Sequence, residues 1–267
     1  MSRYLFHHRY LIARRWVQLL LLFLFAGSNY FGWKVLMGNY SSALVFQKFY
    51  LADPHAVLQT FLSGFAISVD LLVGAVIVLV LYAGISGRAF CSWVCPMNLA
   101  TDFAAWIRQK TAMTDLPGIK NLITRKTRYW ILVLGLVLSV IFGIAAFELI
   151  NPISMLYRGV VFGFGAGIAA VILIFFFDLF VLKNGWCGYI CPLGAFYSLV
   201  SRYSILKVNH KVEACTKCMK CIQICPESQV LEIIGIHSGK IVSGECTNCG
   251  RCIEVCEDNA LKYVLIK

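Results

Sequence analysis

Two runs of cysteines with the same spacing constrain this chain more than any other feature. The runs contain Cys215, Cys218, Cys221 and Cys225, then Cys246, Cys249, Cys252 and Cys256. The spacing C-x2-C-x2-C-x3-C, present twice, is typical of proteins that hold two [4Fe–4S] clusters, in which the fourth cysteine of each run binds the other cluster. This crossing predicts one cluster bound by Cys215, Cys218, Cys221 and Cys256. It predicts a second cluster bound by Cys225, Cys246, Cys249 and Cys252.

A pair of zinc knuckles is the main alternative for these cysteines. A zinc ion needs only four ligands, so zinc would leave the spacing of the third cysteine in each run unexplained. The sequence therefore favours iron–sulfur clusters over zinc.

The rest of the chain is unusually apolar. Of its 267 residues 60% are hydrophobic and 14% are charged, which is far from the composition of a soluble domain. The apolar runs that approach the bilayer-crossing length of about 20 residues are 16–33, 65–85, 129–147 and 160–182. We therefore expect a four-helix, all-α membrane domain over residues 1–200, and a small α+β ferredoxin-like domain over residues 201–267.

The basic residues predict the orientation of this membrane domain. They gather before the first expected span and in the loop after the second, at Arg3, Arg9, Arg14, Arg15, Arg88, Arg108, Lys110, Lys120, Arg125, Lys126 and Arg128. The opposite loops hold only Lys34, Lys48 and Arg158. The positive-inside rule then places both termini in the cytoplasm, with the chain in the inner membrane. The net charge of +11 fits attraction to anionic lipid and gives no nucleic-acid signature.

The four remaining cysteines form two copies of a motif, aromatic-C-x-aromatic-x-C-P. One copy contains Cys91 and Cys95, and the other contains Cys187 and Cys191. Each follows the second helix of an expected helix pair, so the membrane domain is predicted to be two repeats in the same orientation. Four sulfurs brought together on the repeat axis would suit an additional metal or thiol redox centre; thiol–disulfide chemistry and inert helix packing are the alternatives.

Other electron carriers lack their usual ligands. None of the histidines (His7, His8, His55, His210 and His237) lies in an expected span, and no C-x-x-C-H sequence occurs, so neither haem b nor haem c is predicted. No flavin is predicted either. Iron–sulfur centres are therefore expected to carry the electrons.

Acidic residues near apolar runs are candidates for proton handling, because a carboxylate in lipid is costly. Asp70, Glu148 and Asp178 are our candidates for quinol binding or proton acceptance. A structural role is the alternative: Glu148 would pair with Arg158, and Asp178 would reach the headgroup region.

Between the cysteine runs, residues 230–234 alternate in polarity and residues 240–242 follow a turn. This pattern predicts a β-hairpin that covers the clusters.

The order of four spans, two C-x3-CP motifs and a two-cluster domain resembles the NapH family, the membrane quinol dehydrogenase component of periplasmic nitrate reductase systems. The resemblance covers essentially the whole chain, although Glu257 stands where a second proline is common. It implies quinol oxidation, with electrons passing to a NapG-type iron–sulfur protein and on to a periplasmic reductase. The alternatives are an assembly factor that reduces a partner's metal or cofactor, as proposed for FixG-like relatives, and a membrane anchor with structural clusters.

Overall fold

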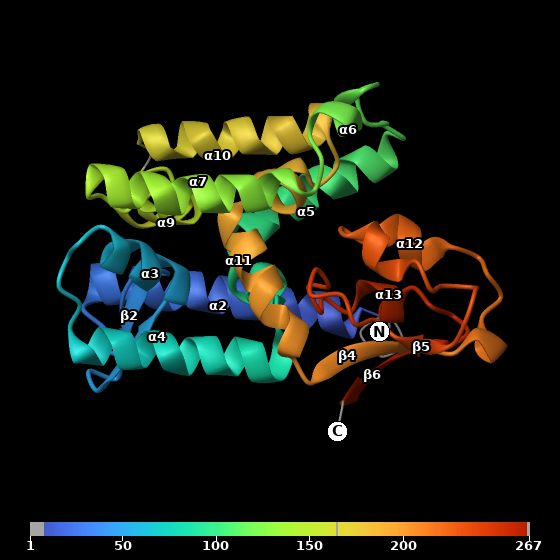
Figure 1. Ribbon diagram of the computed structural model, residues 1–267, viewed down its shortest axis with the longest axis horizontal. Coiled ribbons are helices and arrows are strands. Elements are labelled where there is room, and N and C mark those ends of the chain that lie inside the picture. Colours follow the sequence, from blue (N-terminus) through green and yellow to red (C-terminus); the bar gives the residue numbers. More distant parts are fainter. Residues whose placement is uncertain (1–7, 164, 266–267) are drawn as a thin grey trace. The chain divides into compact units, whose positions relative to one another are not determined.

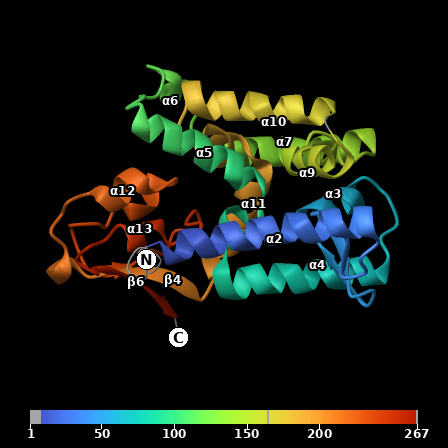
Figure 2. The same cartoon turned by 180° about the vertical axis from the view of Figure 1, so that it is seen from behind.

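The computed structural model describes residues 8–163 and 165–265, so Arg3 and His7 lie outside the described residues. The chain forms two compact units, and each is built from separate stretches of sequence. The first unit contains Met1–Gln18, Val80–Val94 and Tyr197–Lys267, and the second contains Leu19–Leu79 and Cys95–Phe196. Figure 1 and Figure 2 show the ribbon from two sides.

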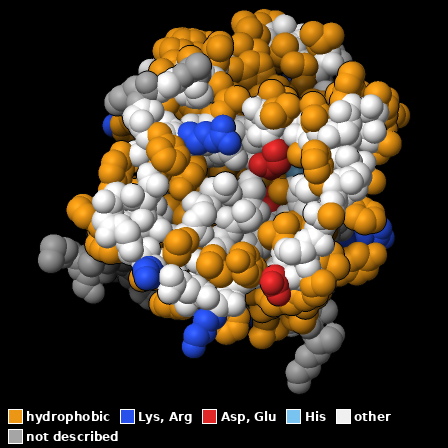
Figure 3. Space-filling view, turned by 90° about the vertical axis from the view of Figure 1, so that its left-hand side faces the viewer, with side chains coloured by type: hydrophobic (Ala, Val, Ile, Leu, Met, Phe, Trp, Pro, Cys, Tyr) orange, Lys and Arg blue, Asp and Glu red, His pale blue; other side chains and the backbone are white. Residues whose placement is uncertain are grey.

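The second unit is mainly helical. Helix α2 (Arg9–Phe31) begins in the first unit and continues in the second. The α-helices that follow are α3 (Pro54–Leu62), α4 (Val69–Leu81), α5 (Met97–Lys110), α6 (Ile119–Leu122), α7 (Thr127–Phe142), α8 (Ala146–Leu149), α9 (Pro152–Phe162), α10 (Ala166–Phe176) and α11 (Pro192–Val200). Many of their apolar side chains face outward, and Figure 3 shows hydrophobic side chains over much of one face, with few charged ones among them.

Two of the described helical stretches, Arg9–Phe31 and Val69–Ser86, are long and apolar enough to cross a membrane. A third qualifies if α7 and residues Ala146–Phe162 count as one span, although they are bent by 100° at the break. The stretch Gly167–Val181 is apolar but shorter. The third expected span therefore ends early at Gly143, and the fourth is broken at Gly163. Both glycines have positive φ angles, of 62° and 93°, which a helix does not accommodate.

The order of elements repeats along the chain. Helix α4 is followed by two π-helical turns, η1 (Tyr82–Ser86) and η2 (Phe90–Val94), and then by α5. Helix α10 is followed in the same way by η3 (Phe177–Val181), η4 (Trp186–Ile190) and α11. Each C-x3-CP motif therefore lies in a π-helical turn that leads into an α-helix. Single π turns of this kind occur often at functional sites.

The short helices α3 and α9 begin alike. Asp53 caps α3 and Asn151 caps α9, each accepting a hydrogen bond from the backbone two residues on, and a proline takes the next position in both. Between α2 and α3 lies an antiparallel sheet of β1 (Leu36–Gly38), β2 (Ser42–Val45) and β3 (Phe49–Ala52), in that order.

The first unit contains a second antiparallel sheet, ordered β5-β4-β6, with β4 (Leu206–His210) in the centre. Its neighbours are β5 (Gly239–Lys240) and β6 (Leu261–Leu265). The short helical segments beside it are η5 (Ser201–Tyr203), η6 (Val212–Ala214), α12 (Lys220–Ile224), η7 (Ser228–Leu231) and α13 (Arg251–Glu254).

The hairpin predicted between the cysteine runs is wrong. Residues Ser228–Leu231 form a 3-10 helix, and Lys240 pairs with Asn209 of β4. Val230, Leu231 and Ile234 are the buried residues of this stretch, and their spacing is helical rather than alternating. They pack with Val208 and Leu261 in the core of the unit, together with several of the cysteines.

Candidate iron–sulfur sites

The two cysteine runs have the same backbone conformation. In the first run Lys217 and Met219 have positive φ angles of 58° and 59°. In the second run the equivalent residues, Asn248 and Gly250, have φ angles of 48° and 77°. Left-handed residues in alternate positions curl a chain tightly, which lets closely spaced side chains converge from one loop. A short helix, α12 or α13, then follows in each run.

One cysteine of the first run lies with three of the second. Cys225 lines the same pocket as Cys246, Cys249 and Cys252, with apolar walls that include Leu231. Burial raises the pKa of the Cys246 thiol to about 11. Burial likewise raises the pKa of Cys252, and the negative charges of four cysteines, Cys249, Cys246, Cys225 and Cys221, raise it further. The four cysteines that line the pocket are the set that the crossed spacing predicts for one cluster.

The other set is more exposed. Cys218 is exposed, Cys215 and Cys256 are half-buried, and Cys221 is buried. Burial raises the pKa of Cys221, and the thiolates of Cys256 and Cys218 act on it in the same direction. Cys256 of the second run therefore lies near the thiols of the first.

Each of these two sets contains four cysteines, the number of ligands that one [4Fe–4S] cluster takes. Among residues 8–163 and 165–265, no three Cys, His, Asp or Glu side chains form a group that could hold one metal ion. A zinc ion draws four sulfurs to about 2.3 Å from one point, whereas a cubane holds its four cysteines around a larger body.

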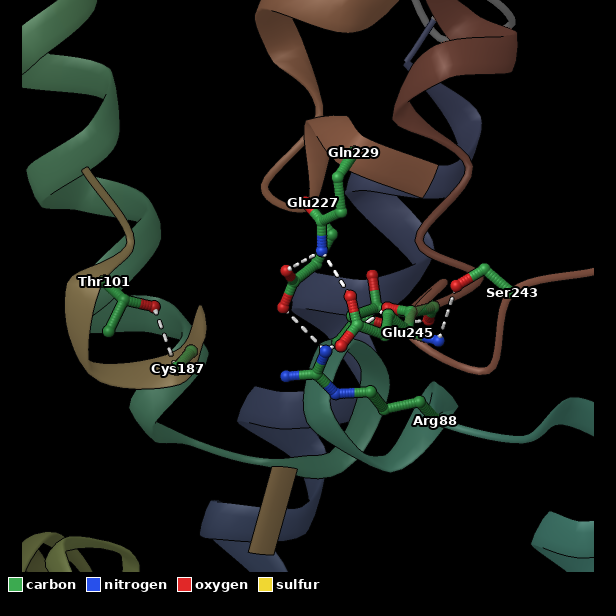
Figure 4. A network of polar contacts seen from close by, with 9 residues as sticks. Arg88, Thr101, Cys187, Glu227, Gln229, Ser243 and Glu245 are labelled. Carbon is green, nitrogen blue, oxygen red and sulfur yellow. Dashed lines mark hydrogen bonds and ion pairs between the residues drawn. The ribbon is translucent and has the colours of Figure 1, made fainter. Parts of the chain in front are cut away.

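A buried ion pair joins the segment before the first C-x3-CP motif to the segments around the second thiol set, which is Cys225, Cys246, Cys249 and Cys252. Arg88 Nη1 lies 2.6 Å from Glu227 Oε1, and the two side chains are 1% and 3% exposed. Arg88 also donates to the backbone oxygen of Glu245, at 3.2 Å. Gln229 donates to the carboxylates of both Glu227 and Glu245 (Figure 4). Glu227 lies two residues after Cys225, and Glu245 directly precedes Cys246, so this network holds two segments that carry thiols.

The first C-x3-CP motif itself bonds to the second cysteine run. Ser92 Oγ donates to the backbone oxygen of Thr247 at 2.7 Å, and Trp93 Nε1 donates to that of Asn248 at 3.0 Å. Tyr263 from β6 donates to the same Asn248 oxygen. The motif that contains Cys91 is thus held directly against the loop that contains Cys246 and Cys249.

The start of α2 contacts the same loop. Glu254 Oε1 accepts hydrogen bonds from the backbone nitrogens of Tyr10 and Leu11, at 2.6 and 3.0 Å. The Tyr10 ring packs edge-on against Tyr263 and covers Gly250. The first turn of α2, which precedes the first expected span, therefore forms part of the wall around the second run.

The second C-x3-CP motif lies in the other unit with Cys95. Asp178 Oδ1 accepts a hydrogen bond of 2.8 Å from the backbone nitrogen of Trp186, where the π turn of this motif begins. Arg108 donates to the backbone oxygens of Asp178 and Leu179. Cys187 Sγ lies 3.9 Å from Thr101 Oγ1 (Figure 4). Asp178 thus has a structural part in positioning this motif.

The other two acidic candidates differ from each other. Asp70 is exposed in the first turn of α4. Glu148 accepts hydrogen bonds from Ser41 Oγ at 2.8 Å and from the Asn151 amide at 3.1 Å. No ion pair joins Glu148 to Arg158 in the part of the chain that the structure describes, and Arg158 is exposed. Glu148 is therefore a linking residue between the sheet and the cap of α9. Roles of Asp70, Glu148 and Asp178 with quinol stay predictions.

Sequence reasoning missed Arg88, Ser92 and Trp93. Ser92 and Trp93 lie between the two cysteines of the motif, so their position was the available signal. Arg88 counts in the sequence only as an orientation charge, because nothing there links it to Glu227, which lies 139 residues away.

Comparison with known proteins gives two family profiles that match the regions containing these cysteines. A profile described as "4Fe-4S binding domain" matches residues 68–113 and again 163–212, once over each C-x3-CP motif. A profile described as "4Fe-4S dicluster domain" matches residues 207–257, which contain both cysteine runs.

Curated relatives extend the match to most of the chain. Ferredoxin-type protein NapH from Escherichia coli is 42% identical over 84% of this chain and 77% of its own length. The chain belongs to the NapH family of ferredoxin-type proteins. NapH from Haemophilus influenzae is 39% identical over 84% of this chain and 77% of its own length. Methylamine utilization ferredoxin-type protein MauN from Paracoccus denitrificans is 38% identical over 89% of this chain and 84% of its own length. No solved structure matches the chain. The chain is thus an iron–sulfur electron-transfer protein, and its apolar helices together with this family indicate a membrane protein.

Proposed function

We propose that the chain is the quinol-oxidising subunit of a membrane electron-transfer system, with both termini in the cytoplasm. In this proposal it takes electrons from membrane quinol and delivers them, by way of iron–sulfur centres, to a NapG-type partner and a periplasmic nitrate reductase. Iron–sulfur clusters supply transfer of single electrons. Support comes from the family, from the apolar helices, and from the two sets of thiols.

The contact between the first C-x3-CP motif and the second cysteine run carries the proposal. The hydrogen bonds from Ser92 and Trp93 to Thr247 and Asn248 hold a segment that directly follows an apolar helix against a cluster-binding loop. A membrane anchor with merely structural clusters would need no such direct attachment of the motif. An electron-transfer subunit needs a short path from the membrane segment to its clusters, and this contact supplies one.

Within this proposal each cysteine is a ligand of one particular cluster or centre. Cys215, Cys218, Cys221 and Cys256 bind one [4Fe–4S] cluster, and Cys225, Cys246, Cys249 and Cys252 bind the other. Cys91, Cys95, Cys187 and Cys191 bind a further redox centre, which the repeated match to a 4Fe-4S binding profile supports.

These ligand assignments are tested on the full chain, purified anaerobically. Iron and sulfide are quantified, and a redox titration is followed by EPR. The expected result is two [4Fe–4S] signals plus a further signal that disappears in Cys91→Ala and Cys187→Ala variants. A short-chain quinol should donate electrons to the clusters that give these signals. Protein that is folded and active without iron and sulfide would overturn the proposal, and unchanged iron content and turnover in both variants would remove the further centre.

The likeness to MauN supports a second candidate for the acceptor. MauN relatives match this chain over a share of its length similar to that of NapH. In the second candidate the same quinol-derived electrons serve a methylamine-utilisation partner, in cofactor maturation rather than nitrate reduction. Electron transfer from the reduced protein to purified nitrate reductase, with and without a NapG-type protein, distinguishes the two.

A further inference from the structure

Helix α3 carries two buried polar side chains without hydrogen-bond partners among the described residues. His55 and Gln59 are both 0% exposed. Both ring nitrogens of His55 and both amide atoms of Gln59 lack a partner. A buried polar group without a hydrogen-bond partner is destabilising, so the fold loses stability at this point unless another molecule pairs with these atoms.

The two side chains lie on one face of their helix, because residues four apart on an α-helix are neighbours. The His55 ring lies 5.6 Å from the Phe147 ring and 5.5 Å from the Phe196 ring, measured between centroids. The Gln59 amide nitrogen lies next to Gly135 of α7, where a Cβ atom would be 3.8 Å away. The surroundings are therefore aromatic and apolar, and a residue without a side chain faces the amide.

The groups around His55 leave it uncharged. Burial lowers the pKa of His55 to about 4, so its imidazole is neutral near pH 7. A neutral imidazole offers one donor and one acceptor, and the Gln59 amide offers both as well. A metal ion would need more ligands than these, and an anion would need a positive charge. A neutral ring that carries hydroxyl or carbonyl oxygens fits both the polar atoms and the apolar walls.

The helix that carries these residues is held firmly at its start. The Asp53 backbone nitrogen donates to the Ser41 backbone oxygen at 2.9 Å. Ser41 and Asn151 both bond to Glu148, so the capped starts of α3 and α9 are tied to the same carboxylate. The backbone that carries His55 and Gln59 is therefore fixed at its start by hydrogen bonds.

We propose that His55 and Gln59 bind the headgroup of the quinol, both hydrogen-bonding to one of its oxygens, in the apolar surroundings of Phe147 and Phe196. This inference rests on the proposed quinol oxidation and assigns its substrate site to residues outside the expected spans.

Binding measurements on the full-length protein in lipid nanodiscs test the site. Decylubiquinone and a short-chain menaquinone are titrated separately, and oxidation of their quinols is measured with an artificial electron acceptor. His55→Leu and Gln59→Leu should each raise the Kd and the quinol KM at least tenfold, while iron content and the dithionite-reduced EPR spectrum stay unchanged. Thr60→Val is the matched control, because Thr60 lies on the same helix and its hydroxyl already donates to the Ala56 backbone oxygen. It should change neither constant.

The outcomes separate the inference from the proposed function. If the unmodified protein neither binds a quinone nor oxidises a quinol, the proposed function fails. If it does both, and the two leucine variants keep its Kd and KM, only the site at His55 and Gln59 is overturned, and buried water pairs with these atoms. Photolabelling with an azidoquinone requires no variant: the label should be recovered in the peptide that contains residues 53–62, and labelling confined to other segments overturns the site.

Discussion

The two cysteine runs have equal spacing and equal backbone conformation, yet their surroundings differ. Residues 216–219 of the first run are all exposed, whereas the equivalent residues 247–250 of the second are buried. The first run is bordered by surface contacts such as the ion pair of Lys220 with Glu257. The second is enclosed by Tyr10, by Tyr263 and by the first C-x3-CP motif.

This difference teaches that ligand spacing specifies the clusters but not their roles. A cluster held by the second thiol set would sit close to the segment that follows an apolar helix. A cluster held by the first set would be near solvent at Cys218, where a soluble partner can approach. The comparison predicts that equivalent changes in the two runs have unequal effects.

The largest difference should come from removing a ligand. Cys252→Ala and Cys218→Ala should each lower the iron content by the amount that one [4Fe–4S] cluster holds, because each variant leaves the four ligands of the other cluster intact. Cys252 packs in the core with Val208 and Leu231, so its variant should also open this region to proteases. Iron analysis with limited proteolysis of residues 201–267 checks this. Equal protease sensitivity of the two variants would contradict the comparison.

The two ion pairs beside the runs offer the next contrast. Arg88→Met leaves Glu227 buried without its partner, which should reduce stability by about 3–5 kcal/mol. Lys220→Met breaks an exposed pair and should leave stability almost unchanged. The temperature at which the iron–sulfur absorbance disappears reports both effects. The double variant Arg88→Met with Glu227→Leu should recover much of the loss; if it does not, the buried charge is not the cause.

A glycine in the second run gives a smaller effect. A Cβ atom on Gly250 would lie 2.6 Å from Tyr10 Cγ, and the φ angle of 77° is left-handed. Gly250→Ala should therefore cost about 1–2 kcal/mol from backbone strain, plus the displacement of the Tyr10 ring. Met219 holds the equivalent position in the first run at φ 59°, and Met219→Gly should be neutral or slightly stabilising. Melting curves of both variants test this, and Tyr10→Ala should relieve only the part of the loss that comes from the ring.

Features that depend on residues close together in the chain could be predicted from the sequence. Features that depend on packing against distant segments could not. The cysteine spacing acts within one loop, so the two runs could be recognised from the sequence alone, and their backbone conformations are alike. The crossed ligand sets, which join the two runs, stay a prediction. The segment 230–234 is mistaken for a strand because Glu232 between apolar residues resembles strand alternation. In the folded unit Val230, Leu231 and Ile234 face one core, and their conformation depends on β4 and β6, which pack there.

The spans show the same limit. Hydropathy counts apolar residues, and it predicts continuous helices through Gly143 and Gly163. It does not register that each glycine adopts a positive φ angle that interrupts the helix. Nor does it register α3, whose buried His55 and Gln59 lie in a segment that hydropathy places between spans.

The smallest effect should distinguish the two C-x3-CP motifs. Trp93 donates a hydrogen bond to the backbone of Asn248, and Trp93→Phe removes that bond at a cost of about 0.5–1.5 kcal/mol. Tyr189 is the equivalent residue in the second motif, and its ring stacks with Arg125, a contact that Tyr189→Phe retains. Trp93→Phe should alter the EPR line shape of the cluster bound by the second thiol set, because the Asn248 backbone lies between two of its ligands. Tyr189→Phe should leave that line shape unchanged. Equal spectra for the two variants would mean that the Trp93 contact does not reach the cluster loop, and that the two motifs are equivalent in this respect.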